Sequence, residues 1–232
     1  MIKEDWQADA REVDAIVSGR HHNPFAFLGL HEINGQWVLR AFIPHAESVT
    51  AFSLDGVALA HLIPRHPAGF FEGKVGVAER QSIRYRARNA GGEWDVYDPY
   101  SFGPVLGPMD DYYIGEGSHL RLFDKLGAHE MEFEGVHGTH FAVWAPNAQR
   151  VSVVGPFNDW DGRRHPMRNR FETGIWEVFI PVLGTGTLYK YEIVGPDGVV
   201  QPLKADPFAR QSELRPHTAS VVPDPTEFTW TD

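Results

Sequence analysis

Short runs in which apolar and polar residues alternate are the dominant pattern of the chain. Residues 83–88 alternate apolar side chains with arginines, and residues 94–96 resume the same period after Gly91-Gly92. Residues 189–193 alternate in the same way and end at the turn signal Pro196-Asp197-Gly198. A period of two indicates a strand with one buried face, and the glycine- and proline-rich breaks indicate turns. The pattern predicts an all-β fold built from hairpins.

Helical spacing occurs at two places. Trp6, Ala10, Val13 and Ile16 recur at the spacing of one helix face, and Gly19 follows as a natural end. A second, shorter helix is expected over 118–126, where Ser118 is a potential N-cap. The remainder of the chain is interpreted as strands and turns.

An internal repeat divides the chain in two. Residues of the first half recur in order in the second half, at an offset that grows from 102 to 108 across turn-rich stretches: Pro44/Pro146, Val49/Val151, Gly69/Gly174, Glu72/Glu177, Tyr85/Tyr191 and Asp98/Asp206. Growth of the offset in turns is typical of small loop insertions in two copies of one fold. The sequence therefore predicts two tandem immunoglobulin-like β-sandwiches with a short N-terminal helix.

The domain boundaries follow from this repeat and from the turn-rich segments between its copies. We expect a helical leader, a first sandwich, a linker with a short helix and a second sandwich, over residues 1–20, 21–105, 106–133 and 134–225.

Charge and composition exclude several classes of partner. The chain has 232 residues, with 21 Lys and Arg against 31 Asp and Glu, and a formal charge of −10. Binding to nucleic acid or to an anionic membrane depends on basic residues, so neither partner is expected. The chain has no cysteine, its first residues are too charged for a signal peptide, and no apolar run could span a membrane. We expect a cytoplasmic protein.

Catalytic and metal-binding patterns are not expected. Two acidic pairs, Asp110-Asp111 and Asp159/Asp161, are close enough in sequence to suggest glycosidase carboxylates, but both lie in turn-like contexts. The histidine groupings His21-His22 and His137/His140 lack a zinc-like ligand set. We therefore expect no catalytic residue, no metal and no cofactor in this chain.

Aromatic residues suggest a binding function instead. Trp144 and Trp176 lie in alternating strand runs and are expected to pack in the core. Trp160 lies between Asp159 and Asp161 in a polar loop, where an indole either closes the end of a sandwich or is offered to a ligand. The apolar face of a sugar stacks well on an indole, and polar side chains around it can bond the hydroxyl groups. A neutral polysaccharide would also tolerate the net negative charge.

Several longer motifs resemble one enzyme family. The segments 141–148 (FAVWAPNA) and 157–167 (FNDWDGRRHPM) closely resemble bacterial glycogen branching enzymes, and so do 21–29 and the run 204–216. The resemblance follows nearly the whole chain in order.

This resemblance implies an accessory role. In that family two N-terminal β-sandwiches precede a catalytic (β/α)₈ barrel, and residues 226–232 would begin the connection to that barrel. The nucleophile and the acid/base of the family belong to the barrel, and no residue here matches them. The implied function is to position α-1,4-glucan chains for transfer to α-1,6 branch points, with α-1,4-glucan or glycogen and the catalytic barrel as partners. The 204–220 segment is the expected docking surface, and the fragment alone is expected to be inactive.

The second sandwich also resembles glycogen-binding modules such as that of the AMP-activated protein kinase β subunit. By that resemblance Trp160 is a stacking residue and Lys190 a second contact, and we include the neighbouring Asn158 as a carbohydrate-binding candidate. The match then fails, because the second stacking tryptophan of those modules is replaced by residues 199–201, Val-Val-Gln.

Two alternatives remain open at this point. One is a free-standing glycogen-binding or targeting module. The other is the N-terminal region of a related debranching enzyme of the amylase superfamily.

Overall fold

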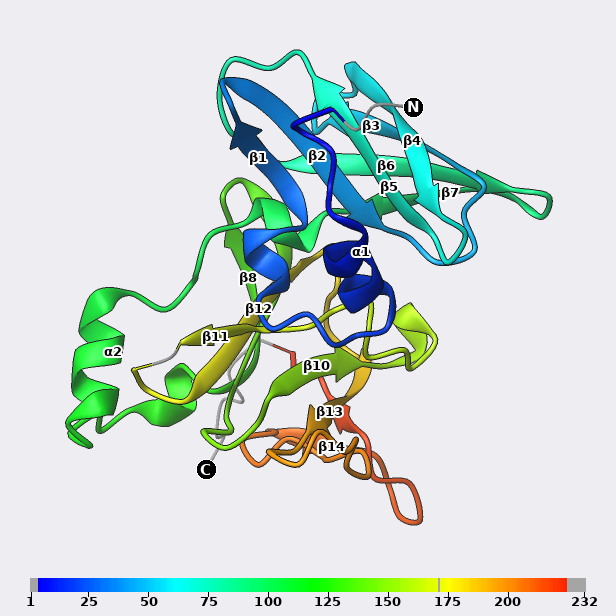
Figure 1. The fold of residues 1–232 in the computed structure, drawn as a ribbon. Coiled ribbons are helices and arrows are strands. Elements are labelled where there is room, and N and C mark those ends of the chain that lie inside the picture. The colour runs from blue at the N-terminus through cyan, green and yellow to red at the C-terminus, as the bar shows by residue number, and fades with distance from the viewer. Residues whose placement is uncertain (1–3, 171, 225–232) are drawn as a thin grey trace. The chain divides into compact units, whose positions relative to one another are not determined.

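The computed structural model describes residues 4–170 and 172–224 and forms two compact units that divide between Gly103 and Pro104 (Figure 1). Strands make up most of both units, and two α-helices accompany them in the described residues. The predictions of an all-β fold with two tandem immunoglobulin-like β-sandwiches and of a short N-terminal helix are confirmed.

The first unit has one continuous sheet that folds into two layers. Its elements are α1 (Ala10–Val17), η1 (Pro24–Ala26), β1 (Gly29–Ile33), β2 (Gln36–Phe42), β3 (Ser48–Ser53), β4 (Ala58–His66), β5 (Phe70–Val75), β6 (Ile83–Asn89), β7 (Gly92–Tyr97) and η2 (Pro99–Ser101). The strand order is β1-β2-β5-β4-β3-β6-β7. One end of β4 pairs with β3 and the other with β5, with an irregularity between Pro64 and His66, so this long strand joins the two layers.

Helix α1 packs on the outside of this sandwich. The predicted helix is confirmed over Ala10–Val17, where Val13, Ile16 and Val17 are buried against a cluster that includes Phe27 and Phe70. Of the other two residues of the predicted stripe, Trp6 precedes the helix and Ala10 is exposed. The Asp9 side chain caps the helix by accepting the Arg11 N–H at 2.9 Å.

The second unit is a sandwich of two four-stranded sheets. Its elements are α2 (Pro108–Gly115), η3 (Leu122–Asp124), β8 (Gly127–Phe133), β9 (Val136–Trp144), β10 (Arg150–Val154), η4 (Pro156–Asn158), β11 (Arg168–Arg170), β12 (Ile175–Pro181), β13 (Leu188–Val194), β14 (Gln211–Ser212) and β15 (Ser220–Val221). The sheet orders are β11-β12-β9-β8 and β10-β13-β15-β14. Phe141, Tyr189 and Tyr191 are among the fully buried side chains.

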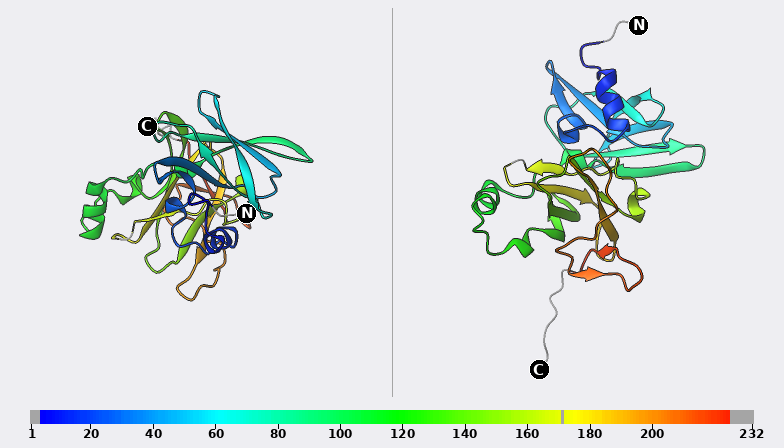
Figure 2. Two further views of the ribbon diagram at one scale, coloured as in Figure 1. Left: turned by 45° about the horizontal axis from the view of Figure 1, so that its top comes forward. Right: turned by 60° about the horizontal axis from the view of Figure 1, so that its bottom comes forward.

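The predicted helix over 118–126 is wrong in place and type. The α-helix of this region, α2, lies earlier at Pro108–Gly115, and 118–126 contains a 3₁₀ turn instead. At the start of α2, Pro108 favours the first helical turn and Asp110 accepts the Gly107 N–H at 3.0 Å. Ser118 donates to the Tyr113 carbonyl and therefore lies past the end of the helix. Figure 1 and Figure 2 show α2 as a separate green coil at a distance from β12.

The repeat extends further than the sequence analysis found. Helices α1 and α2, the turns η1 and η3, and strands β1 and β8 recur at a constant offset of 98. The motif Leu-Gly-x-His-Glu begins at both Leu28 and Leu126, and in each copy the histidine lies within 3.0 Å of the leucine carbonyl. Each copy thus begins with its helix, ahead of the first strand.

The segment predicted as a linker, 106–133, belongs to the second unit. It contains α2, η3 and β8, and β8 pairs with β9 along its whole length. Leu106 and Leu126 are buried with Ala142 and Ile175 in one apolar cluster. The predicted connection at 226–232 lies outside the described residues. Within the described part of the chain, no helix has the length and apolar character needed to cross a membrane.

Candidate functional site

The loop that carries Trp160 begins where β10 ends. After the 3₁₀ turn η4, Asp159 and Trp160 both adopt the left-handed conformation, with φ values of 57° and 58°. Two consecutive non-glycine residues in this region store strain, which persists when the surroundings fix the backbone. The Trp160 N–H donates to the Gly155 carbonyl at 3.0 Å, which closes the loop on itself. The indole is left 38% exposed at the loop surface.

Asn158 is the internal support of this loop. Its Oδ1 accepts the Gly155 N–H at 2.9 Å, and its Nδ2 donates to the Val153 carbonyl at 2.8 Å. The same Nδ2 lies 2.9 Å from Nδ1 of His165. Burial, together with the smaller effect of the positive charge of Arg164, lowers the pKa of His165 to about 3, so the ring is neutral and its Nδ1 can accept.

This placement changes the interpretation of Asn158. Asn158 was expected to contact a carbohydrate directly, but the residue is fully buried and both amide hydrogens are directed at protein groups. A ligand at the surface would have to break these bonds to reach it. Asn158 therefore positions the loop and does not present itself to a ligand.

Ion pairs fasten the rest of the loop. Arg164 donates to Asp159 at 2.7 Å, and Arg163 donates to both carboxylate oxygens of Asp161. Burial alone would raise the pKa of Asp161, but the bonds from Arg163 lower it below its usual value. Asp159 and Asp161, the carboxylates considered above as catalytic candidates, therefore bond to arginines of their own loop.

The loop lies over the outer face of the β10–β13 pair. A Cβ added at Gly162 would lie 2.1 Å from Oε1 of Glu192, so the backbone at Gly162 rests directly on that carboxylate. Glu192 in turn pairs with Arg150. A larger residue at position 162 would have to displace this carboxylate.

Lys190 borders the same outer face. It lies two residues before Glu192 on β13, between the buried Tyr189 and Tyr191, and its cross-strand partner is Val154. Successive side chains of a strand point to opposite faces, so Lys190 and Glu192 share the face that the loop covers. The Lys190 ammonium donates at 2.7 Å to Oγ1 of Thr218, which lies just before β15. The structure thus brings Lys190 and the Trp160 loop to one face.

Trp144 differs from the packing prediction. Trp176 is buried as expected, but Trp144 is 61% exposed, and its indole N–H donates to the Thr173 carbonyl at 3.2 Å. Trp144 is the last residue of β9 and is followed directly by Ala145-Pro146. This position at the end of a strand is the sequence signal that could have predicted an exposed side chain, whereas the alternation of the run predicts a buried one.

The other candidate carboxylates also have partners. Asp110 accepts from Gly107 and lies near His119 and Lys125, and Asp111 pairs with Arg170. In the described part of the chain, no group of three or more histidine, aspartate or glutamate side chains is arranged to hold a metal ion. The region around Trp160 therefore presents an exposed aromatic ring with polar groups near it.

Two family models match the two units separately. Residues 9–100 match the N-terminal domain of the alpha-1,4-glucan branching enzyme GlgB, and residues 125–209 match carbohydrate-binding module 48, the isoamylase N-terminal domain. The second match contains both Trp160 and Lys190.

Curated relatives extend the similarity over nearly the whole chain. The 1,4-alpha-glucan branching enzyme GlgB of Mesorhizobium japonicum is 66% identical over 98% of this chain, and that of Rhizobium meliloti is 64% identical over 96%. These matches cover 31% and 30% of the two relatives, so the chain spans less than a third of their length.

Solved structures give a weaker similarity. Ligand-free PulA from Klebsiella pneumoniae is 18% identical, with a TM-score of 0.38, over 85% of this chain and 21% of that one. The sequence matches therefore show similarity to the N-terminal region of curated 1,4-alpha-glucan branching enzymes, with a branching-enzyme N-terminal domain model on the first unit and a carbohydrate-binding module model on the second.

Proposed function

We propose that this chain binds α-1,4-glucan on the outer face of its second unit and positions it for a branching reaction carried out by a catalytic domain elsewhere in a longer protein. The reaction is the one that the names of the relatives state, 1,4-alpha-glucan branching. The catalytic barrel is the partner of this chain in the proposal, and the cytoplasm, where glycogen is made in bacteria, is its location.

The observation that carries the proposal is the way Trp160 is held. A loop that only connects two strands would not need two left-handed residues, a buried asparagine and two ion pairs to fix one indole at the surface. A pre-organised aromatic ring loses little conformational freedom when a sugar stacks on it. Lys190 on the same face provides a donor for the sugar hydroxyls.

The absence of a second stacking ring limits the strength of this site. Val199 and Val200 are both more than half exposed at the place where the resembling kinase modules have a tryptophan. One stacking contact contributes about 1–3 kcal/mol, by analogy with nucleobases on aromatic rings. Affinity for a long polymer would then depend on several weak contacts engaged together.

The 204–220 segment remains our candidate surface for the catalytic barrel. Its backbone is anchored in the second unit, since Lys204 pairs with Tyr191, and the Asp206 N–H donates to Oγ of Ser220 at 2.9 Å. Leu214, on its outer side, is 87% exposed. An anchored backbone that presents an apolar side chain is suited to contact with another domain.

Replacement of Trp160 tests the proposal. Trp160→Ala should weaken binding to glycogen about five- to 150-fold, since it removes one stacking contact. Affinity electrophoresis in native gels with increasing glycogen measures the dissociation constant. Trp144→Ala is the matched control, because it removes an exposed tryptophan of the same unit that lies outside the loop.

The two variants separate the outcomes. Equal mobility of the Trp160→Ala variant and the unchanged chain, with thermal unfolding preserved, would contradict the proposed site. Weakened binding in the Trp144→Ala variant alone would move the site to the end of β9.

A further inference from the structure

The first unit contains a hollow that the function proposed above does not use. It has a volume of about 450 Å³ and is lined by seven residues: Glu4, Asp5, Trp6, Ile33, Asn34, Gln36 and Lys74. Three segments meet there, namely the stretch before α1, the β1–β2 turn and the end of β5. A volume in this range accommodates a small ligand.

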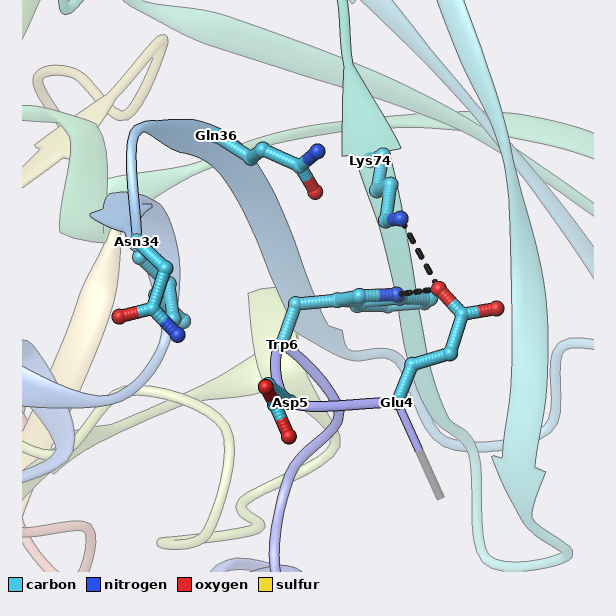
Figure 3. A pocket seen from close by; sticks show the side chains of 7 residues that line it. Glu4, Asp5, Trp6, Asn34, Gln36 and Lys74 are labelled. Atoms are coloured by element: carbon cyan, nitrogen blue, oxygen red, sulfur yellow. Dashed lines mark hydrogen bonds and ion pairs between the residues drawn. The ribbon is translucent and has the colours of Figure 1, made fainter. Parts of the chain in front are cut away.

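Trp6 is 7% exposed, and the small open part of its indole forms a fixed apolar floor of the hollow. Its Nε1 donates to Oε2 of Glu4 at 2.5 Å, and the Lys74 ammonium lies 5.3 Å from the ring centroid (Figure 3). Lys74 also pairs with Glu4 at 2.9 Å. The Trp6 carbonyl accepts from the buried Arg40 at 3.0 Å, so the backbone is anchored as well. The ring is therefore held in place before any ligand arrives.

Two carboxamides stand at the rim of the hollow. Asn34 and Gln36 flank Gly35 in the β1–β2 turn, and Figure 3 shows both side chains beside the indole. Both are exposed, and within the described residues the structure gives neither side chain a hydrogen-bond partner. The turn explains the backbone of Asn34, which has a φ of 51°, but it requires no particular side chain at position 36.

The charges at the hollow favour an uncharged ligand. The carboxylate of Glu4 is neutralised by Lys74, and Asp5 adds a second, exposed carboxylate. An anion such as a phosphate would meet these carboxylates with one cation, already paired, to bind it. A neutral polyhydroxylated ligand can use carboxamides, a carboxylate and an ammonium together, because each hydroxyl both donates and accepts.

We propose that this hollow is a second saccharide site, which binds a glucose unit of an α-glucan between the Trp6 ring and the carboxamides of Asn34 and Gln36. The choice of α-glucan among neutral saccharides rests on the proposed function, whereas the site itself rests on the geometry of the first unit. A glucan site in each unit would let one polymer engage both, which raises the effective concentration for the second contact.

Titration of the ¹⁵N-labelled chain with maltoheptaose tests this inference by NMR. The Trp6 indole N–H and the side-chain amides of Asn34 and Gln36 should shift and saturate, and they should do so equally in the Trp160→Ala variant. Loss of either carboxamide should raise the dissociation constant at this site about three- to tenfold, the effect of one uncharged hydrogen bond. The variants are Asn34→Gly, which keeps a residue that tolerates positive φ, and Gln36→Ala.

Gln81→Ala is the matched control, since Gln81 is a partly exposed amide in the loop between β5 and β6 and should leave the titration unchanged. Shifts confined to the Trp160 indole and its neighbours would overturn the second site and leave the proposed function standing. The absence of any shift, at Trp6 and Trp160 alike, would overturn both.

Discussion

Asn158 illustrates what residue type and motif can and cannot decide. The same amide could bond a sugar hydroxyl or the backbone of its own loop, and the sequence Phe-Asn-Asp-Trp is compatible with both uses. The structure resolves this through burial, because Asn158 bonds the Gly155 N–H, the Val153 carbonyl and His165 inside the loop. Trp160 could be proposed from the sequence, because a large ring in a polar loop is visible there, whereas Lys190 was implied only by the resemblance to glycogen-binding modules.

The neutral His165 should make the loop sensitive to acid. Its pKa, about 3 in the folded chain, lies below the ordinary value of 6.5, so the unfolded chain binds the proton first. The stabilisation is complete above pH 6.5 and is lost as the pH falls towards 3, by at most about 1.4 kcal/mol per pH unit. Asn in place of histidine keeps an acceptor near the Nδ1 position and does not titrate.

Urea unfolding of the unchanged chain and of His165→Asn at pH 7, 6, 5 and 4 measures this effect. The free energy of unfolding of the unchanged chain should fall relative to that of the variant at each step below pH 6.5. Parallel pH profiles for the two proteins would show that His165 is not the titrating group.

At the scale of elements, a buried glutamate fastens the start of each copy of the fold. Glu72 on β5 accepts the Ala8 N–H at 2.9 Å, and Glu177 on β12 accepts the N–H groups of Val105 and Leu106 at 3.0 and 3.1 Å. Each also pairs with an arginine of the neighbouring strand, Arg65 and Arg170. The repeat Glu72/Glu177 was visible in the sequence, but its partners were not, because the contact joins residues about 70 positions apart.

Replacement of either glutamate should weaken the attachment of the segment that begins the same copy of the fold. Burial would raise the pKa of Glu177, but His140, the Leu106 N–H and Arg170 lower it, so the side chain is charged at neutral pH. Glu177→Met keeps the length and removes both charge and acceptor. The variant should lose about 3–5 kcal/mol of unfolding free energy, as a broken buried ion pair does.

Hydrogen exchange localises this change. The amides of Val105 and Leu106 should exchange faster in Glu177→Met, whereas the Ala8 amide should keep its protection, and Glu72→Met should give the reverse pattern. Equal acceleration at all three amides would mean that the glutamates stabilise each unit as a whole and not the segment that they bond.

At the scale of the whole chain, the count of two sandwiches was predictable and their boundaries were not. Strand alternation and the repeat identify two copies, but α2 has no buried residue, so no apolar stripe marked the start of the second copy. The equivalent α1 buries three residues and was recognised from its stripe. The turn-rich sequence of 106–133 predicts a linker, although Leu106 and Leu126 lie in the core.

Separate expression of the two units tests the division that the structure shows. Residues 1–103 and 104–232 should each unfold cooperatively in urea, because each has its own sheets and buried clusters. Residues 134–232 alone should unfold at a lower urea concentration, since removal of β8 leaves β9 as an open edge and exposes the cluster around Ala142. Equal midpoints for 104–232 and 134–232 would instead make 106–133 a dispensable linker, and the pairing of β8 with β9 would then contribute nothing to the stability of the module.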